Sequence, residues 1–240
     1  MNHPLSIRLL SEFAGTGILV GLGTGAVVAS VGTGAERFPL LAVAWFVAVT
    51  VPVVLFAGIS GAHLNPVVSV ALAADRRLPS REVPGHVVAQ VAGAFAGSAV
   101  VELVLGPGGH LGATIPAAND LLRIFGDEFA FTFLLVLTVL VLVRRGTGRW
   151  RWGLTWPGLV VAASTYVIGP FTGSSLNPAR SLAPAVLSGT YTDLWVYFLA
   201  APLAALAAVA LVRAVTRNRF PGNGRPNPGP GRVPPLAPVE

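Results

Sequence analysis

The fold of this chain is decided by two short stretches, Ser60-Gly61-Ala62-His63-Leu64-Asn65-Pro66-Val67 and Gly173-Ser174-Ser175-Leu176-Asn177-Pro178-Ala179-Arg180. Each sets an Asn-Pro pair in front of a short apolar run. Asn is a favoured N-cap, and Pro suits the first helical position because its missing N–H would be unpaired there anyway. The pairs therefore predict helices from Asn65 to about Ala74 and from Asn177 to about Ser188. At 1.5 Å per residue each is roughly 15–18 Å long, half of a ~30 Å hydrocarbon core.

The composition is that of a membrane protein. Hydrophobic residues make up 53% of the 240 residues and charged residues 11%, with a mean hydropathy of +0.71, whereas a soluble domain carries about 25% charged residues. The absence of Cys excludes disulfides and thiolate metal sites. The net charge of +6 comes from Arg residues in loops and in the C-terminal tail, which indicates charge beside a membrane rather than nucleic-acid binding.

Apolar runs predict six membrane spans, which we place at about residues 9–31, 39–59, 83–105, 122–143, 154–168 and 194–215. The N-terminal run is too long for the core of a signal peptide, and we expect it to be retained as the first span. The predicted membrane domain covers residues 1–215. A Pro-, Gly- and Arg-rich tail, expected to be disordered and cytoplasmic, covers residues 216–240.

The two halves of the membrane domain repeat each other. Residues 11–20 parallel residues 127–136 at an offset of 116, with Glu, Phe, Ala, Thr, Leu and Val in step, and the Asn-Pro pairs repeat at an offset of 112. Repeat 1 (about 8–105) and repeat 2 (about 122–215) each hold an odd number of spans, so they insert in opposite orientations. Inverted repeats with broken helices place a solute site where the half-helix N-termini converge.

The distribution of Arg predicts the orientation. The N-terminus, the 76–81 and 144–151 loops and the tail, counted together with Arg213 at the end of the last span, lie on one side of a six-span topology and hold 13 Arg, against three on the other side. Under the positive-inside rule both termini are cytoplasmic. We therefore expect a multi-pass protein of the plasma or inner membrane.

The irregular backbone ahead of each half-helix predicts a pore lining, because such backbone at mid-membrane depth is tolerated only where it is buried or lines a wet cavity. We expect pore-facing carbonyls at Gly61, Ala62, His63, Gly173, Ser174 and Ser175. The half-helix N-termini and the side-chain amides of Asn65 and Asn177 would donate hydrogen bonds to a passing solute, and their positive potential would repel cations and protons. Arg180, an intramembrane cation, is a further functional-site candidate.

Two acidic residues and a histidine allow alternative interpretations. Glu12 and Glu128, near the starts of their spans, could be proton-relay acids, but we favour carboxylates that accept hydrogen bonds from the loop backbone beside the half-helices. His63 could be a ligand or a gate. A structural role beside the bend is favoured because no second His or acid lies at ligand spacing, and His86 is expected in a loop or at the membrane interface.

Over about residues 8–214 the sequence resembles the aquaporin family of major intrinsic proteins. The resemblance rests on the two Asn-Pro motifs, the second followed by Ala179-Arg180, on the Glu-Phe starts of both repeats and on the six-span layout. It implies an all-α membrane protein, with an aquaporin-like channel domain in which a right-handed bundle of six transmembrane helices and two re-entrant half-helices form inverted repeats. It further implies one pore per protomer and a homotetramer in the lipid bilayer. Asn65 and Asn177 would be the paired central asparagines, and Arg180 the arginine of the outer selectivity filter.

The resemblance also implies the other filter residues through their distances from the Asn-Pro motifs. They are Trp45, twenty residues before the first motif's Asn, and Thr165 and Ser174, twelve and three residues before the second's. The Thr165 assignment can slip by one residue, to Ser164 or Tyr166, because a helix alignment without an anchor is loose.

The resemblance gives mixed indications of the solute. Trp45 resembles glycerol facilitators, and Thr165, in place of the His of strict water channels, implies a wider opening. Against this, Ser181 stands where glycerol facilitators usually carry Asp. Val67 in the first motif, in place of the usual Ala, resembles some plant nodulin-like members that pass metalloids and glycerol.

These observations predict a passive channel for water and small uncharged solutes that excludes ions and protons, with glycerol-like polyols and undissociated metalloid acids as candidates. No cofactor, metal or nucleotide site is implied, and neither enzyme activity nor nucleic-acid binding is expected. The first alternative is a strict water-selective channel, which differs in the width of the filter. The second is a coupled secondary transporter with broken helices, which would need an acid or an ion site at mid-membrane.

Overall fold

Helices dominate the structure. The computed structural model describes residues 3–117, 120–146 and 151–218, and it contains no strand over these residues. In chain order the helices are α1 (Leu5–Ala29), α2 (Arg37–Phe56), α3 (Pro66–Ala74), α4 (Val83–Leu105), α5 (Leu121–Arg145), α6 (Trp156–Val167), α7 (Gly169–Thr172), α8 (Pro178–Ser188) and α9 (Leu194–Asn218). Short 3₁₀ segments are η1 (Gly34–Glu36), η2 (Ser80–Glu82), η3 (Gly108–Gly112) and η5 (Arg151–Thr155).

Five of the predicted spans are single helices long and apolar enough to cross a membrane: α1, α2, α4 with the preceding η2, α5 and α9. The remaining predicted span, about 154–168, is built from pieces. Helix α6 has only 12 residues, but η5, α6 and α7 follow one another from Arg151 to Thr172 with only Ile168 between the last two. Together they are roughly 30 Å long. Helix α9 runs to Asn218, past the predicted limit at 215, and the rest of the predicted tail lies outside the described residues.

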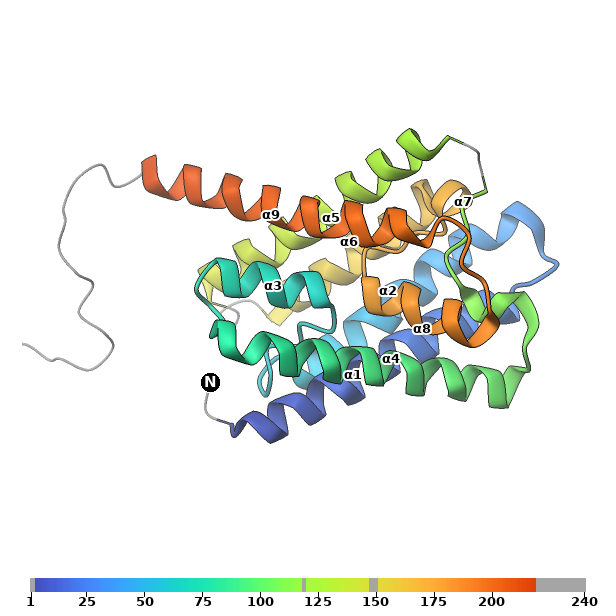
Figure 1. The fold of residues 1–240 in the computed structure, drawn as a ribbon, viewed down its shortest axis with the longest axis horizontal. Coiled ribbons are helices and arrows are strands. Elements are labelled where there is room, and N and C mark those ends of the chain that lie inside the picture. The colour runs from blue at the N-terminus through green and yellow to red at the C-terminus, as the bar shows by residue number, and fades with distance from the viewer. Residues whose placement is uncertain (1–2, 118–119, 147–150, 219–240) are drawn as a thin grey trace, which may run out of the picture.

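The two predicted half-helices are confirmed as α3 and α8, of 9 and 11 residues. Pro66 and Pro178 occupy the first helical positions, and the preceding Asn side chains cap the free N–H groups. Helix α8 ends at Gly189, whose φ of 68° is left-handed and suits a residue without a Cβ. Figure 1 shows α3 and α8 one after the other along the length of the bundle, so that together they traverse it.

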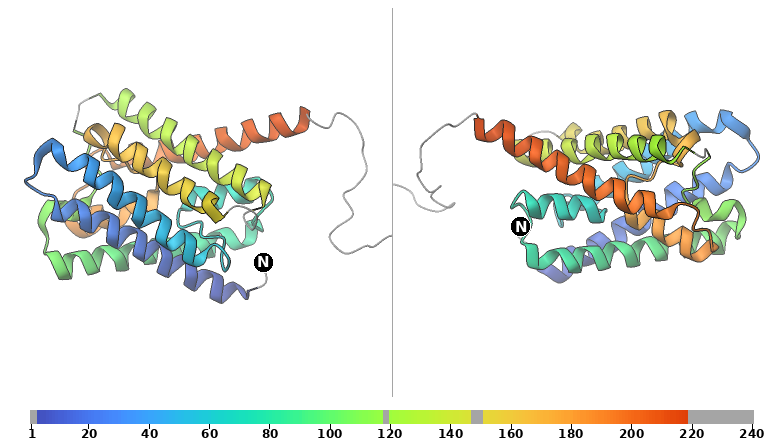
Figure 2. Two further views of the ribbon diagram at one scale, coloured as in Figure 1. Left: turned by 180° about the vertical axis from the view of Figure 1, so that it is seen from behind. Right: turned by 45° about the horizontal axis from the view of Figure 1, so that its top comes forward.

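The helices pack as corresponding pairs in the two halves. Helix α1 packs on α4 as α5 packs on α9, while α2 packs on α6 across the halves. Figure 2 shows the long helices from two further sides, running along a common axis. The α5–α9 contact buries a series of alanines on α9, Ala201, Ala205 and Ala208, against Val136 and Leu140 of α5. Small residues therefore line the closest helix contacts, as expected where helices associate inside a membrane.

Glycines allow an even closer approach between α1 and α4. A Cβ added to Gly93 would lie 2.1 Å from the carbonyl oxygen of Phe13, and one added to Gly97 would lie 2.4 Å from that of Gly17. Because both obstacles are backbone atoms of α1, no side-chain rotation relieves the overlap. The two helices can adopt this spacing only with glycine at these positions.

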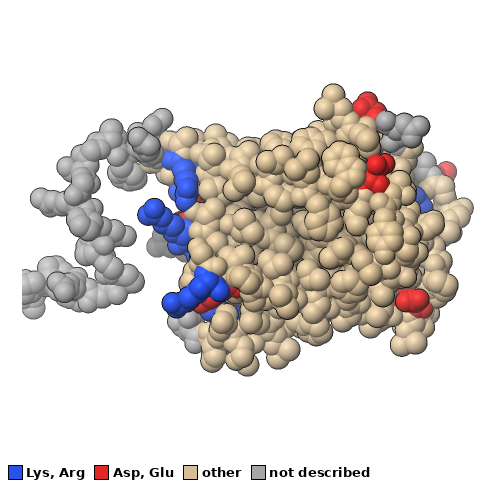
Figure 3. Space-filling view, in the orientation of Figure 1, with Lys and Arg blue, Asp and Glu red and all other residues tan. Residues whose placement is uncertain are grey.

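The outer surface suits a lipid environment with polar ends. Large apolar side chains such as Leu103 and Leu122 point outward, and Figure 3 shows an uncharged band between two charged ends. At one end, hereafter the Arg-rich end, Arg8, Arg77, Arg144 and Arg213 all contact the segment 74–82. Asp75, directly after α3, accepts hydrogen bonds from Arg144 at 2.5 and 3.1 Å and forms an ion pair with Arg77.

Gly93→Ala is expected to lower the melting temperature of the protein in detergent, because its methyl group forces α1 and α4 apart. Differential scanning fluorimetry measures the effect. Gly126→Ala in α5 is the matched control, since nothing lies within 4 Å of its added Cβ. Ala is favoured over Gly in a helix by about 1 kcal/mol, so the control should melt no lower than wild type. Equal melting of the two variants would contradict the close-packing account.

Candidate functional site

The N-termini of the two half-helices are joined by reciprocal hydrogen bonds. The Nδ2 atom of Asn65 donates to the carbonyl oxygen of Leu176 at 2.8 Å, and Nδ2 of Asn177 donates to that of Leu64 at 2.8 Å. The Oδ1 atom of each Asn accepts from its own helix, at Val67 N (3.0 Å) and Ala179 N (3.0 Å) respectively. Each amide group has two N–H donors, so one N–H of each remains for a solute.

Val67 and Ala179, the third residues of the two motifs, are buried in hydrophobic clusters and line neither of the two cavities described below. Val67 is buried in a cluster with residues of α5 and α9, among them Val136 and Ala205. Ala179 is buried against the other main cluster, which includes Ala94 of α4. The larger Val side chain therefore fills a helix contact and does not narrow the space beside the asparagines.

Two cavities run inward from the ends of the molecule. The first has a volume of about 370 Å³ and extends from Arg77 at the Arg-rich end to Asn65 and Asn177. The second has a volume of about 300 Å³ and lies toward the opposite end, beside Val31 and Gly109. Among the described residues, two line both cavities: Trp45 and Arg180.

Trp45 and Arg180 lie where the two cavities adjoin. The guanidinium carbon of Arg180 lies 4.7 Å from the centroid of the Trp45 ring, and both side chains are almost fully buried. Arg180 Nη1 donates to the carbonyl oxygen of Gly112 at 2.8 Å. Arg180 Nε is buried and has no hydrogen-bond partner within the described part of the chain, so this donor faces no protein acceptor.

The remaining predicted filter residues lie differently. Thr165 lines the second cavity and donates its hydroxyl to the carbonyl of Val161 at 2.9 Å. The two neighbouring alternatives do not line it: Ser164 is buried and Tyr166 is 59% exposed on the outer surface. Ser174 is absent from the lining of both cavities, and its hydroxyl is hydrogen-bonded to that of Ser164 at 2.8 Å.

The predicted lining residues other than Ser174 are found along the cavities. Gly61, Ala62, His63 and Ser175 line the first cavity, and Gly173 lines the second. Four residues in these segments have left-handed φ angles, Ala62 (47°) and Leu64 (53°) before α3 and Ser174 (48°) and Leu176 (54°) before α8. Such conformations are uncommon without glycine. They recur at the same offset in both halves, so the two segments share one backbone path.

Glu12 holds the segment before α3. Its Oε1 accepts from the hydroxyl of Ser60 at 2.7 Å and from the backbone N–H of His63 at 3.0 Å. Its Oε2 accepts from the backbone N–H of Leu64 and from the side chain of Gln90, both at 2.7 Å. All four acceptor positions of the carboxylate are therefore used.

Glu128 does the same for the segment before α8. Its Oε1 accepts from the hydroxyl of Thr172 at 2.7 Å and from the backbone N–H of Ser175 at 2.9 Å. Its Oε2 accepts from the backbone N–H of Leu176 at 3.0 Å. The two acids thus bind matching backbone groups in the two halves, as expected for carboxylates that support the loops.

His86 does not lie in a loop, which was one of the two places expected for it. His86 is fully buried in α4, and its ring stacks on that of His63 with centroids 5.1 Å apart and planes 23° apart. One ligand atom from each of Glu12, His63 and His86 lies within 4.8 Å of the other two, so the sequence spacing hid a cluster that the α1–α4 contact brings together. By distance this group could hold a metal ion. However, the nitrogen lone pairs of an imidazole lie in its ring plane, and the planes of His63 and His86 are only 23° apart. The two lone pairs therefore do not point toward one common ion, and all acceptor positions of Glu12 are already occupied.

Sequence reasoning also missed the segment around η3 as a functional element. Gly112, with a φ of 70°, presents its carbonyl to Arg180, and its Cβ position would lie 2.8 Å from Thr24. Thr114 donates to the hydroxyl of Ser181 at 2.9 Å, which ties this segment to α8. A Gly-rich stretch was visible in the sequence, but nothing in it indicated contact with the arginine.

A protein-family model described as "Major intrinsic protein" matches residues 3–212 of this chain. The chain belongs to the major intrinsic protein family. Aquaporin NIP1-3 from Oryza sativa subsp. japonica is 37% identical over 232 residues, covering 91% of this chain and 78% of the relative. Nodulin-26 from Glycine max is 33% identical over 209 residues, covering 86% and 77%. The X-ray structure of the aquaglyceroporin from Plasmodium falciparum superposes with a TM-score of 0.78 at 27% identity, covering 90% and 98%.

Family membership confirms the aquaporin-like fold and settles the class of activity. Major intrinsic proteins are membrane channels and not enzymes, so the protein is a channel. The two cavities that share Trp45 and Arg180 lie within this channel protein.

Glu12→Gln is expected to destabilise the protein and to reduce water flux. An amide has one acceptor oxygen, so at least one buried donor, such as the Leu64 N–H, loses its partner at a cost of about 1–3 kcal/mol. Thermal melting in detergent and stopped-flow shrinkage of proteoliposomes measure the two effects. Glu102→Gln, at an exposed site in the last turn of α4, is the control. A Glu12→Gln protein that melts and conducts like the control would remove Glu12 from loop support.

Proposed function

We propose that the channel passes water and small uncharged solutes of glycerol size, and excludes ions and protons. Undissociated metalloid acids are further candidate solutes. The proposal rests on one observation: the two cavities meet at a tryptophan face and an arginine, Trp45 and Arg180.

The chemistry of this constriction suits a solute with one carbon face and one hydroxyl face. The Trp45 indole offers an apolar surface, while the guanidinium of Arg180, a residue that lines both cavities, offers N–H donors. Thr165 lines the second cavity and donates its hydroxyl hydrogen to the carbonyl oxygen of Val161. What remains for a solute is its small methyl group and the acceptor side of its oxygen. We assign Trp45, Thr165 and Arg180 to the filter wall, and Ser174 to its support through Ser164.

Electrostatics supports the exclusion of cations and protons. The Arg180 charge and the positive ends of α3 and α8 lie along the same path. Asn65 and Asn177 each keep one amide donor beside the first cavity. A water molecule that accepts hydrogen bonds from both amides has no free lone pair on its oxygen. It cannot take up a proton from a neighbouring water, so a proton cannot move through it along the file of waters.

The relatives support the same solute class. The similar structure is titled an aquaglyceroporin, and the similar sequences are named aquaporin NIP1-3 and nodulin-26. A coupled transporter is less well supported, because Glu12 and Glu128 are engaged by hydrogen bonds from the loops. Neither carboxylate is arranged as a free ion or proton site.

Stopped-flow light scattering of proteoliposomes tests the proposal. A sucrose shock reports water permeability, and an inward glycerol gradient reports solute entry. We expect rapid shrinkage in sucrose and fast re-swelling in glycerol, with no proton leak seen by a pH-sensitive dye inside the vesicles. Fast shrinkage without glycerol entry would instead identify a strict water channel.

The same assay includes a filter variant. Thr165→His should reduce glycerol flux more than water flux, because the larger imidazole takes up space in the second cavity beside Trp45 and Arg180. Tyr166→His is the matched control, since that neighbouring side chain is exposed on the outer surface and should leave both fluxes unchanged. Equal loss of water and glycerol flux in Thr165→His would exclude residue 165 from size selection.

We also propose that both termini and the Arg-rich end are cytoplasmic, with repeat 1 over about 8–105 and repeat 2 over about 122–215. The gathering of Arg side chains at one end in Figure 3 supports this orientation. Because the chain has no Cys, single cysteines can be labelled without background. An impermeant maleimide should label Ala117→Cys but not Ser80→Cys in intact cells, and the reverse pattern would overturn the orientation.

A homotetramer in the plasma or inner membrane is proposed from family membership. Native mass spectrometry of the detergent-solubilised protein tests this assembly. A monomeric mass under conditions that preserve the fold would contradict it.

A further inference from the structure

On α1, Gly23 packs so closely against the Trp45 ring that no side chain fits between them. A Cβ added to Gly23 would lie 2.4 Å from both Cη2 and Cζ3 of Trp45 and 2.7 Å from its Cε3. Real Cβ atoms essentially never approach other heavy atoms closer than 3.0 Å. No side chain at position 23 is therefore compatible with the observed position of the Trp45 ring.

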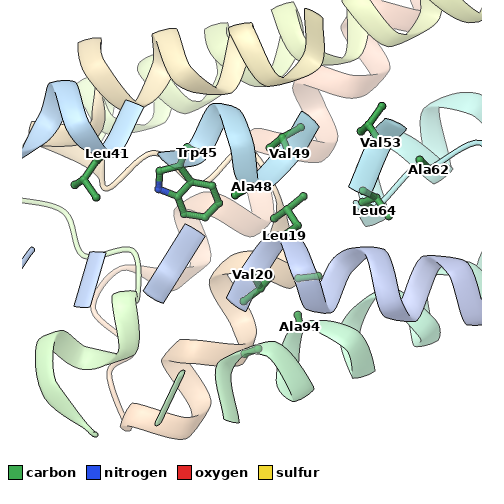
Figure 4. Close-up of a cluster of buried hydrophobic side chains, with 12 residues drawn as sticks. Leu19, Val20, Leu41, Trp45, Ala48, Val49, Val53, Ala62, Leu64 and Ala94 are labelled. Carbon is green, nitrogen blue, oxygen red and sulfur yellow. The ribbon is translucent and has the colours of Figure 1, made fainter. Parts of the chain in front are cut away.

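Gly23 lies on the face of α1 that follows the pore. Leu19, Gly23 and Val27 are four residues apart and share one face of the helix. Leu19 lines the first cavity and Val27 lines the second. Gly23 thus lies at the level where the two cavities meet, and Figure 4 shows the Trp45 indole extending from α2 toward α1 at this level, beside Leu19 and Val20.

The Trp45 ring is held between Gly23 and Arg180. The face of its six-membered ring lies against the backbone of α1 at Gly23, and the guanidinium carbon of Arg180 lies over the indole at 4.7 Å from a ring centroid. The indole is rigid and 4% exposed. A methyl group on Gly23 would therefore displace the ring from α1 toward Arg180, across the opening.

We propose that Gly23 is a further specificity-determining residue of this channel. Its missing side chain lets the Trp45 ring lie back against α1, and this sets the width left beside Arg180 for a solute. The inference rests on the proposed function, in which Trp45 and Arg180 form the constriction. It adds α1 as a wall of a filter otherwise assigned to α2, α6 and α8.

Gly23→Ala tests the proposal in the proteoliposome assay. Glycerol permeability should fall severalfold, with a smaller fall in water permeability, because water needs less width. Helix propensity does not account for such a loss, since Ala is the better helix former. Gly25→Ala is the matched control on the same helix: its Cβ would lie 3.6 Å from Val101 of α4, an ordinary contact, and both fluxes should match wild type.

A double-mutant cycle with Trp45→Phe isolates the contact. The shorter phenyl ring lacks the outer atoms of the indole, Cζ3 and Cη2, over which the new methyl group would lie. Gly23→Ala should therefore have little effect on either flux in the Trp45→Phe background. An equal effect in both backgrounds, or an unchanged glycerol-to-water ratio in Gly23→Ala alone, would overturn the proposal.

Failure of the proposed function is distinguishable from failure of this inference. A wild-type channel without glycerol flux would overturn the proposed solute, and the cycle would then be read on water flux in the same four proteins. Melting temperature in detergent controls for folding. If Gly23→Ala folds poorly, Trp45→Phe should recover folded protein in the double variant, and absence of that recovery would also overturn the inference.

Discussion

Unpaired backbone in an apolar membrane interior is the constraint on which this structure depends. A half-helix that starts at the middle of the molecule requires a non-helical segment beside it, and unsatisfied N–H groups there cost several kcal/mol each. Glu12 and Glu128 remove that cost by accepting from backbone donors in the two segments. Carboxylates suit this task because one group accepts several hydrogen bonds, so the carbonyls are left to line the pore.

The two halves use this scaffold for different purposes. Asn65 and Asn177 occupy equivalent places and bond reciprocally, so the centre of the pore is nearly symmetric. The flanking regions are not. The first half adds the buried His63–His86 stack, whereas the second half adds Arg180, which together with Trp45 lines both cavities. The symmetric groups thus hold the two half-helices together, and the proposed filter is built from side chains that the two halves do not share.

The selectivity of such a pore is a matter of packing as well as polarity. The Trp45 ring can lie beside Arg180 without blocking the path because Gly23 behind it has no side chain. Arg180 keeps its place because Gly112 offers a carbonyl from a segment distant in sequence. The positions of the two proposed filter side chains therefore depend on residues behind them, in α1 and around η3.

Local stereochemistry determined much of this protein from the sequence alone. The Asn-Pro pairs specify helix starts, the apolar runs specify spans, and the repeated Glu residues predict supports for the loops, because each of these features acts within a few residues or one helix. The contacts of His86, Ser174 and Gly23 were decided only by the tertiary structure. They depend on how closely α1 approaches α4 and α2 and on where α6 meets the segment before α8. Helix spacing and rotation are set by the summed packing of side chains along whole helices, and no short stretch of sequence encodes that sum.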